Sequence, residues 1–316
     1  MRTDPTHGAS IRVAGGRRLS YTITGPPNGM PVIYCHGAIG TAVGRSIDLE
    51  TLTSELGVRY IAVNRPGVGT SDKCPGRTVL DFAQDIQELS DALGLSRFAV
   101  VGVSAGGPYA LAIAHELPER VDRVALCSSL SPLGAPHRIP GTDPQVRIAL
   151  TALARAPWTW AHIGDALLPV IRRRPQLITA VIAAHAARSE RARVRRPEER
   201  AAAIASFLDA TASGVGGMID DYMTCCRDWG FAPGEVGAEV HLWHGVRDPI
   251  VPVEHALQLA IALPRCRVFF DADEGHHFFR SRLGTILGVL IGREGHVPTS
   301  LQQARTMMRE LGRLRH

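Results

Sequence analysis

A short apolar run, residues 98–103, ends at a serine flanked by glycines in the pattern Gly-x-Ser-x-Gly. The pattern predicts a buried strand that turns at once into a helix, with Ser104 at the turn. The serine has a strained backbone there, and side chains two positions away would collide with neighbouring backbone, which explains Gly102 and Gly106. The hydroxyl projects from the turn, while the N–H of Ala105 opens the helix and points at the group under attack. Ser104 is therefore a candidate nucleophile.

The segments around this turn alternate between helix and strand. Apolar residues at helical spacing over 78–93, followed by Gly94, predict a helix before the strand. Residues 105–117 predict a second helix that Pro118 stops, and residues 121–126 predict another strand. This alternation is typical of an α/β protein with a parallel sheet, and it places the serine at the carboxyl end of a strand, where ligands bind.

A serine hydroxyl is a poor nucleophile at neutral pH, so it needs a base and a third group that orients the base. Strand-like residues 240–245 are followed by a loop that holds Asp248, and strand-like residues 267–270 by a loop that holds His276. The order serine, aspartate, histidine is expected when the three residues follow successive strands of one parallel sheet. The chain thus supplies both partners.

Two further motifs make the chain similar to the α/β-hydrolase fold superfamily, over residues 32–277. Residues 31–40 resemble the family's strand that ends in His-Gly, and residues 63–72 resemble its Arg-Pro-Gly-x-Gly-x-Ser loop. The resemblance implies an α/β fold with a mostly parallel central sheet of about eight strands, flanked by helices, and a helical lid insertion. A serine in place of the aspartate of related dehalogenases and epoxide hydrolases implies an ester-type acyl-enzyme.

The resemblance also assigns roles to individual residues. It implies a catalytic triad of Ser104, Asp248 and His276, because His276 follows a glycine as the family's histidine does; His277 stays open as the base. The other implied residues form or shape the oxyanion hole: the backbone N–H groups of Ala38 and Ala105, and the loop residues His36 and Gly37. No metal site and no organic cofactor are implied.

The chain is predicted to divide into three parts. Residues 1–129 and 238–292 form the hydrolase core. Residues 130–237 are rich in alanine and arginine and lack strand-like runs, so they predict a helical lid or cap between two strands. Residues 293–316 predict a basic helical extension. The other expected elements are an edge hairpin over 10–14 and 17–24 and a closing helix over 278–291.

Composition limits the partners and the compartment. A 45% hydrophobic fraction over 316 residues can bury a large core, and no apolar run is long enough to cross a membrane. We therefore expect a soluble, cytoplasmic protein without a transmembrane segment. The net charge of +5 comes from arginine, but the arginines of 188–200 alternate with glutamates as on a solvated helix face, so nucleic-acid binding is not expected. Six cysteines without Cys-x-x-Cys spacing predict buried free thiols.

The sequence favours a carboxylesterase-like serine hydrolase acting on a small or medium, hydrophobic ester. Lactonase, thioesterase, carbon–carbon bond hydrolase and perhydrolase chemistry stay open, because the shape of the pocket decides among them. A second hypothesis is a catalytically weak ligand receptor or signalling partner, for which the arginine-rich lid and the C-terminal extension offer docking surfaces. A monomer and a homodimer both stay open.

Overall fold

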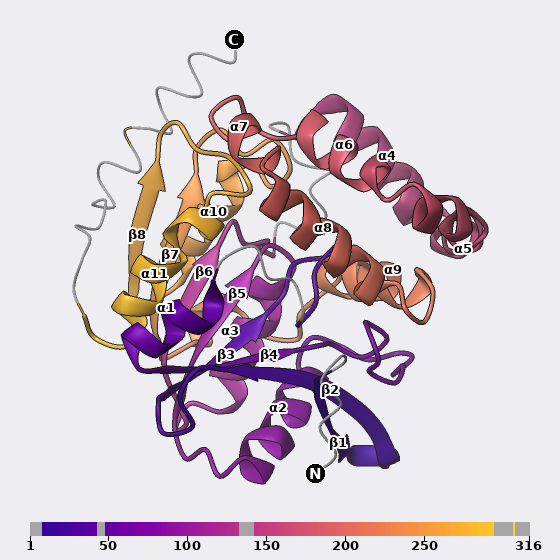
Figure 1. The fold of residues 1–316 in the computed structure, drawn as a ribbon. Coiled ribbons are helices and arrows are strands. Elements are labelled where there is room, and N and C mark those ends of the chain that lie inside the picture. The colour runs from indigo at the N-terminus through magenta and orange to yellow at the C-terminus, as the bar shows by residue number, and fades with distance from the viewer. Residues whose placement is uncertain (1–7, 43–47, 133–141, 294–305, 307–316) are drawn as a thin grey trace.

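The computed structural model describes residues 8–42, 48–132, 142–293 and 306. One sheet runs through the centre of the molecule (Figure 1). Its strands are β1 (Ala9–Val13), β2 (Arg17–Thr24), β3 (Met30–Cys35), β4 (Val58–Val63), β5 (Phe98–Val103), β6 (Val121–Cys127), β7 (Glu239–Gly245) and β8 (Cys266–Asp271). They lie in the order β1-β2-β4-β3-β5-β6-β7-β8, all parallel from β4 to β8. The mostly parallel sheet of eight strands is confirmed.

Five helices cover the two faces of the sheet: α1 (Leu49–Leu56), α2 (Asp81–Ala92), α3 (Gly106–Glu116), α10 (Val253–Ala262) and α11 (Phe279–Leu290). Residues of α2, α3 and α10 belong to the apolar core on one face, and residues of α1 and α11 pack into the core on the other. Every residue of β5 is buried, with Val100 in the first core and Val101 in the second. A strand enclosed on both faces must be apolar throughout, which explains the run in the sequence.

The predicted edge elements are present. β1 and β2 pair antiparallel at one edge of the sheet, joined by a 3₁₀ turn (Ala14–Gly16) in which Gly15 and Gly16 both have a φ of 73°. The helix expected over 78–93 begins three residues later, at Asp81. Its start is set by Thr78, whose N–H and hydroxyl both donate to the Asp81 carboxylate, at 2.6 and 2.9 Å.

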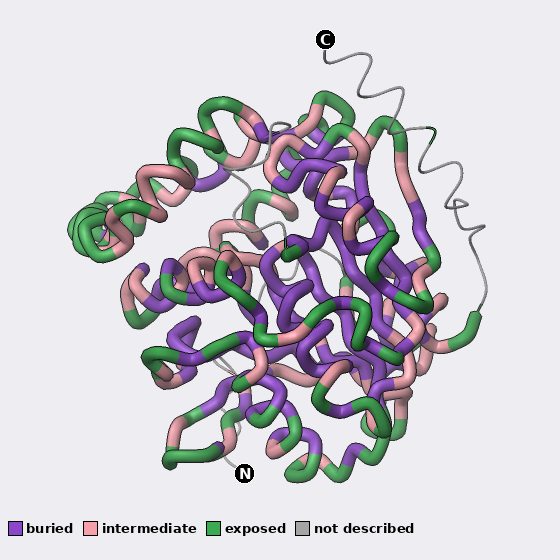
Figure 2. Tube along the Cα trace, turned by 180° about the vertical axis from the view of Figure 1, so that it is seen from behind, coloured by how far each residue is buried: buried purple, intermediate pink, exposed green. Residues whose placement is uncertain are grey.

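Between β6 and β7 the chain is helical, and its described part contains no strand. The helices are α4 (Pro144–Arg155), α5 (Pro157–Arg173), α6 (Gln176–Ala184), α7 (Arg191–Val194), α8 (Pro197–Ala210) and α9 (Gly216–Cys225), followed by a 3₁₀ turn (Pro233–Glu235). We call α4 to α9 the insertion. Figure 1 shows α8 and α9 nearer the sheet and α4, α5 and α6 beyond them. Figure 2 shows the sheet buried, while the outer helices are largely exposed.

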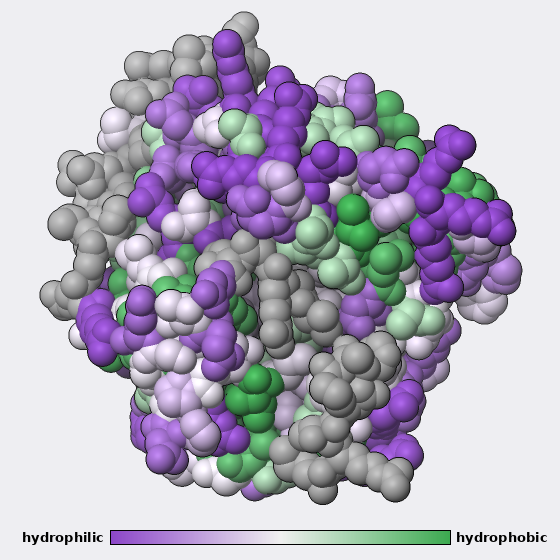
Figure 3. Space-filling model, in the orientation of Figure 1, coloured by the Kyte–Doolittle hydropathy of each residue, from purple (hydrophilic) through white to green (hydrophobic). Residues whose placement is uncertain are grey.

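One prediction concerns residues that the structure barely covers. The C-terminal extension over 293–316 lies almost wholly outside the described residues. The six cysteines are free, as predicted, but the prediction that they are buried holds for Cys35, Cys127 and Cys225 alone; Cys74, Cys226 and Cys266 are half-buried. Within the described ranges, no helix combines the length and the apolar character that a membrane crossing requires. Figure 3 shows hydrophilic residues over much of one face of the molecule, with hydrophobic patches over the insertion and also in the lower part of the view.

Candidate active site

Ser104 joins β5 to α3 in a backbone conformation that residues with side chains rarely adopt. Its φ is 54°, in the left-handed region, as the sequence pattern predicts. A Cβ at Gly102 would lie 2.7 Å from the carbonyl oxygen of Gly106, and a Cβ at Gly106 would collide with the carbonyl oxygen of Cys35. The Ser104 N–H donates to the carbonyl of Cys127, at the end of β6, at 2.8 Å. The turn is therefore fixed at the carboxyl edge of the sheet.

The loop after β3 lies against Ser104. A Cβ at Gly37 would be 3.4 Å from the Cβ of Ser104, so the backbone of this loop is close to the serine. The buried His36 ring bonds through Nδ1 to the carbonyl of Gly37 at 2.7 Å, and its Nε2 accepts the N–H of Arg65 at 3.4 Å. Because Nε2 accepts, the proton resides on Nδ1. Burial and the nearby Arg65 charge lower the pKa of His36 to about 3, so an uncharged ring holds the loop.

A fully buried ion pair supports this loop. Arg65, which follows β4, donates from Nη1 to the carbonyl of His36 at 2.6 Å and from Nη2 to that of Gly37 at 3.4 Å. The same guanidinium bonds to both carboxylate oxygens of Asp221 on α9, at 2.7 to 3.0 Å. Neither side chain is exposed. Because Asp221 belongs to the insertion, the insertion is tied to the loop beside Ser104 through this pair.

Arg77 and Tyr109 complete the charged cluster. Arg77 donates to Asp221 Oδ1 at 2.5 Å and to the Tyr109 hydroxyl at 2.6 Å, and that hydroxyl donates to Asp221 Oδ1 at 3.0 Å. Burial alone would raise the pKa of Asp221, but Arg65 and Arg77 hold it well below its usual range. The carboxylate is thus charged, and two guanidiniums against one carboxylate leave an excess positive charge next to the loop.

Asp248 and His276 meet in the loops after β7 and β8. Asp248 is buried; its Oδ1 accepts the N–H groups of Ile250 and Val251 at 2.8 and 2.9 Å, and its Oδ2 accepts His276 Nδ1 at 2.7 Å. Burial alone would lower the pKa of His276, but the Asp248 carboxylate raises it above its ordinary value. The hydrogen bond through Nδ1 leaves Nε2, on the other side of the ring, as the basic atom.

Backbone hydrogen bonds join the loops that carry these residues. The strands β5, β6, β7 and β8 are adjacent, so their carboxyl ends form one continuous edge. At that edge the Ser128 N–H donates to the carbonyl of Trp243 at 2.9 Å, and the Ser128 hydroxyl donates to the carbonyl of His276 at 3.5 Å. Ala105 follows Ser104 at the start of α3, and Ala38 packs against the core from the loop after β3. The predicted site residues thus belong to loops at one edge of the sheet.

His277, the alternative base, is placed differently from His276. No hydrogen bond between its ring and Asp248 is present; its ring lies edge-on to that of His276, with centroids 5.5 Å apart. Burial and the His276 charge lower the pKa of His277 to about 3. The Asp248 carboxylate therefore binds His276, and His277 is a half-buried neighbour whose ring is uncharged.

Glu190, just before α7, is a second buried carboxylate beside the histidine loop. The solvated helix face expected for the glutamates of 188–200 is therefore wrong for Glu190, because its carboxylate is enclosed between the insertion and this loop. Its Oε1 accepts the N–H of His277 at 2.7 Å, and a Cβ at Gly275 would lie 2.6 Å from its Oε2. Arg193 donates to Glu190 at 3.2 Å and to Glu274 at 2.9 Å. The Glu190 charge also contributes to the raised pKa of His276. The insertion therefore contacts the histidine loop as well as the loop beside Ser104.

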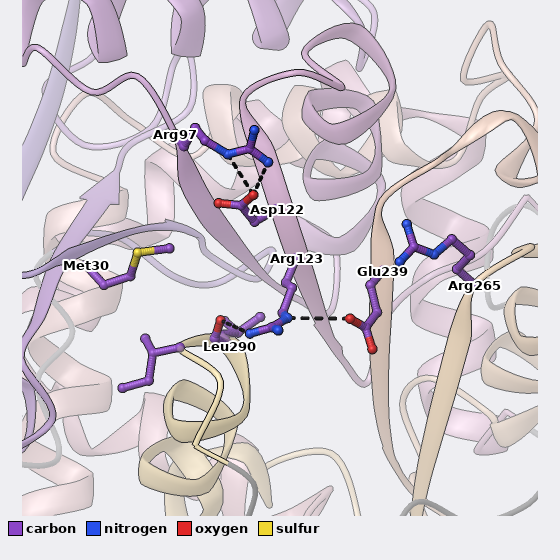
Figure 4. A pocket seen from close by; sticks show the side chains of 8 residues that line it. Met30, Arg97, Asp122, Arg123, Glu239, Arg265 and Leu290 are labelled. Atoms are coloured by element: carbon purple, nitrogen blue, oxygen red, sulfur yellow. Dashed lines mark hydrogen bonds and ion pairs between the residues drawn. The ribbon is translucent and has the colours of Figure 1, made fainter.

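A cavity of about 400 Å³ lies at the other end of the sheet, where β3, β6 and β7 begin (Figure 4). Its charged side chains are largely paired with one another: Arg97 with Asp122, and Arg123 with Glu239. Because Ser104 follows the carboxyl end of β5, this cavity is not part of the candidate site. Among the described residues, no three histidine, cysteine or carboxylate side chains come together as a metal site would require.

The sheet, with a serine turn after its fifth strand and a histidine–aspartate pair after its last two, defines a class of α/β proteins that carry their chemistry at the carboxyl edge of the sheet. The family model described as alpha/beta hydrolase fold matches residues 30–282. The chain therefore belongs to the α/β-hydrolase fold family, and the resemblance seen in its motifs is confirmed.

Curated relatives match a limited part of the chain. A proline iminopeptidase of Neisseria gonorrhoeae is 29% identical over 125 residues, which are 39% of this chain and 40% of that protein. A non-heme chloroperoxidase of Streptomyces lividans is 31% identical over 126 residues, which are 39% of this chain and 45% of that protein. The chain thus spans less than half the length of these relatives.

Solved structures match most of the chain. An esterase from Exiguobacterium antarcticum has a TM-score of 0.63 at 21% identity, covering 90% of this chain and 98% of the esterase. A bromoperoxidase from Bacillus anthracis has a TM-score of 0.67 at 20% identity, with the same coverage of 90% and 98%. At such identities the likeness shows the fold.

Proposed function

We propose that the protein is a serine hydrolase that cleaves an ester-type bond of a small or medium, hydrophobic substrate through an acyl-enzyme. Ser104 is the nucleophile, His276 the base and Asp248 the group that orients the base. The observation that carries the proposal is the 2.7 Å hydrogen bond between His276 Nδ1 and Asp248 Oδ2, at the same sheet edge as the strained turn of Ser104.

In the first half of the reaction, His276 Nε2 takes the hydroxyl proton as Ser104 Oγ attacks the carbonyl carbon of the ester. The N–H groups of Ala38 and Ala105 hold the oxyanion of the tetrahedral intermediate. The intermediate collapses, the bond to the alcohol oxygen breaks, and the alcohol leaves with the proton from His276. In the second half, His276 takes a proton from water, the hydroxide attacks the acyl carbon, and the acid leaves as the proton returns to Ser104 Oγ.

The charges behind the site favour an oxyanion next to Ser104. Arg65 contacts the carbonyls of His36 and Gly37, and its cluster with Arg77 and Asp221 holds more positive than negative charge. The amino end of α3 adds the positive end of a helix dipole. Loss of one oxyanion donor typically lowers the rate by about 10²- to 10³-fold. In this proposal the insertion is the lid of the site and selects the substrate.

The test combines active-site labelling with turnover. A fluorophosphonate should label Ser104, as found by peptide mapping, and the protein should hydrolyse p-nitrophenyl esters of short or medium chain length. Ser104→Ala should lower kcat/KM by about 10⁴-fold or more, with an unchanged thermal unfolding temperature. Ser54→Ala, at an exposed position of α1, is the matched control and should label and turn over normally.

Three outcomes contradict the proposal or change it. Undiminished turnover by Ser104→Ala would show that Ser104 is not the nucleophile. Absence of both labelling and turnover in the unmodified protein favours the receptor hypothesis. The substrate panel should include lactones, thioesters and proline p-nitroanilide, the last because a proline iminopeptidase is among the relatives. If one of these compounds is turned over faster than any ester, the proposed substrate class changes and the proposed triad is retained.

A further inference from the structure

Exposed apolar side chains gather on the outer helices of the insertion. Among the residues that the structure describes, ten large hydrophobic side chains are exposed, and eight of them lie on α4, α5 and α6. The most exposed is Trp158, at 79%. On α5, a row of four is 40% to 50% exposed: Trp160, Ile163, Leu167 and Val170. Spacings of three and four residues place this row on one face of α5.

The same helices carry positive charge. Residues 144–184 contain five arginines, no lysine, no glutamate and a single aspartate, Asp165. That carboxylate accepts the N–H of Val215 at 2.7 Å, just before α9, so it is already engaged. In Figure 3, hydrophobic residues lie beside strongly hydrophilic ones at the upper right, over these helices. The surface is thus both apolar and basic.

A groove of about 770 Å³ borders α6, which also carries two of the exposed apolar side chains. One side of the groove is formed by α6, mainly by its alanines, and the other holds Arg191, Arg195 and Arg200 from α7, α8 and the turn between them. All three arginines are exposed. Within the described ranges, Arg195 and Arg200 have no side-chain hydrogen bond or ion pair, so their guanidinium donors are available to an anion.

A surface that is both apolar and basic fits a membrane better than it fits a second copy of this chain. Helices that lie in a membrane surface present tryptophan and leucine at the boundary between headgroups and acyl chains, and their arginines reach the lipid phosphates. A second copy of this chain offers a face of the same positive sign, and two such faces repel each other. An anionic lipid surface complements both the charge and the apolar row.

We propose that α4, α5, α6 and the adjoining arginine groove form a docking surface for a membrane that contains anionic phospholipid. The apolar row on α5 enters the headgroup boundary, and the groove arginines contact lipid phosphates. The protein then binds the membrane peripherally. This inference does not depend on the catalytic proposal, because it concerns side chains outside the candidate site.

The test is co-sedimentation of the full chain with vesicles of phosphatidylcholine alone or mixed with phosphatidylglycerol. The protein should pellet with the mixed vesicles and remain in the supernatant with the neutral ones, and added salt should weaken binding. Docking should also shift the tryptophan emission to shorter wavelength. Trp158 and Trp160 report this shift, since the remaining tryptophans, Trp229 and Trp243, are buried.

Matched variants assign the binding to the proposed surface. Leu167→Glu should weaken binding to mixed vesicles by about tenfold or more, because a carboxylate is unfavourable in the boundary and is repelled by anionic lipid. Ile261→Glu, at a position on α10 that is 60% exposed, is the control and should bind normally. The double change of Arg195 and Arg200 to glutamine should weaken binding, whereas Arg227→Gln, at another exposed position, should not.

Three results would overturn the proposal. The first is an unmodified protein that ignores mixed vesicles or binds neutral vesicles equally well. The second is an equal loss of binding in Leu167→Glu and Ile261→Glu. The third is a dimer in sedimentation velocity that Leu167→Glu dissociates, without vesicle binding, which would make the surface an interface between two copies of the chain.

Discussion

Two regions of the molecule differ in how far their side chains are buried: the sheet core around Ser104, and the insertion. In α3, directly after Ser104, every residue from Gly106 to Ala114 is buried. By contrast, α4 has no buried residue and α5 has one, Leu168. The difference is visible in Figure 2, where purple fills the sheet region and green marks the projecting helices. The core is held by apolar packing, and the outer insertion is not.

The inner part of the insertion, from Glu190 to α9, differs from both the sheet core and the outer helices. It contacts the site through buried carboxylates. Asp221 on α9 binds Arg65, which holds the loop beside Ser104, and Glu190 before α7 binds the loop of His276. Both carboxylates are buried completely. Apolar packing tolerates rearrangement, whereas a buried charge that loses its partner is strongly unfavourable. These two contacts therefore tie the inner part of the insertion to the loops of the site, while α4, α5 and α6 take no part in them.

In the sheet core, we expect the largest effect from a change at Asp248. In Asp248→Asn, the amide NH₂ can face His276 Nδ1, which favours the tautomer with the proton on Nε2. That tautomer cannot accept the Ser104 proton, so kcat/KM for an ester should fall by about 10³- to 10⁴-fold. Because the Asp248 charge raises the pKa of His276, that pKa should also fall. Steady-state kinetics on an ester identified by the panel measures the loss.

Asp228→Asn, at an exposed position beyond α9, is the control for the aspartate-to-asparagine change and should retain full activity. Circular dichroism on both variants checks that the fold is intact. Full activity in Asp248→Asn would mean that another group orients the base, and His276 would lose its assigned partner.

On the insertion side, Asp221→Asn should act mainly on stability. The change leaves Arg65 and Arg77 buried beside a neutral amide, which should lower the free energy of unfolding by about 3 to 5 kcal/mol. Because the pKa of Asp221 is held below its usual range, the stabilisation is present at neutral pH and is lost as the pH falls through the lowered pKa. Urea unfolding at neutral pH measures the difference.

The neighbouring Asp220 provides the comparison, because it lies on the same helix and is exposed. Asp220→Asn should unfold within about 0.5 kcal/mol of the unmodified protein. Equal stability of the two variants would show that the buried ion pair does not hold α9 to the core. If the proposed function holds, the activity of Asp221→Asn should fall as well, since Arg65 then positions the loop beside Ser104 less firmly.

The sequence predicts the sheet core and the turn at Ser104 well, for a physical reason. A parallel strand enclosed on both faces must be apolar, and a strained turn admits only glycine at its close contacts, so 98–106 shows its structure locally. The loops after β7 and β8 follow from the same alternation, which places Asp248 and His276 at one edge. The choice of His276 over His277 needs the structure, because it depends on which ring faces Asp248.

The charged contacts of the insertion are not predictable in the same way. Asp221 and Arg65 are 156 residues apart and Glu190 and His277 are 87 apart, so neither pair leaves a local pattern. One local sign does exist for Asp221: it shares a face of α9 with the buried residues Gly217 and Thr224, four residues before it and three after it. A carboxylate on the buried side of a helix requires a partner, but only the fold identifies that partner.

The smallest effect is expected at Glu190, where the charge can be removed and the shape retained. In Glu190→Gln, the amide oxygen can still accept the His277 N–H. The lost negative charge should lower the pKa of His276, because Glu190 and Asp248 both raise it against burial. The catalytic base must be unprotonated, so the acidic limb of the kcat/KM profile should move to lower pH, with little change at alkaline pH.

The direction of this shift separates an electrostatic role of Glu190 from a purely structural one. Besides His276, the charged or titratable groups around the carboxylate are Arg193, Glu274, His277 and Asp248, and all of them are retained in Glu190→Gln. A loosened histidine loop would lower kcat/KM at every pH and leave the limb in place. Glu198→Gln, at an exposed position in the first turn of α8, should leave the whole profile unchanged. An acidic limb that stays in place in Glu190→Gln, with kcat/KM unchanged, would contradict the assignment, because it would mean that Glu190 carries no charge that His276 senses.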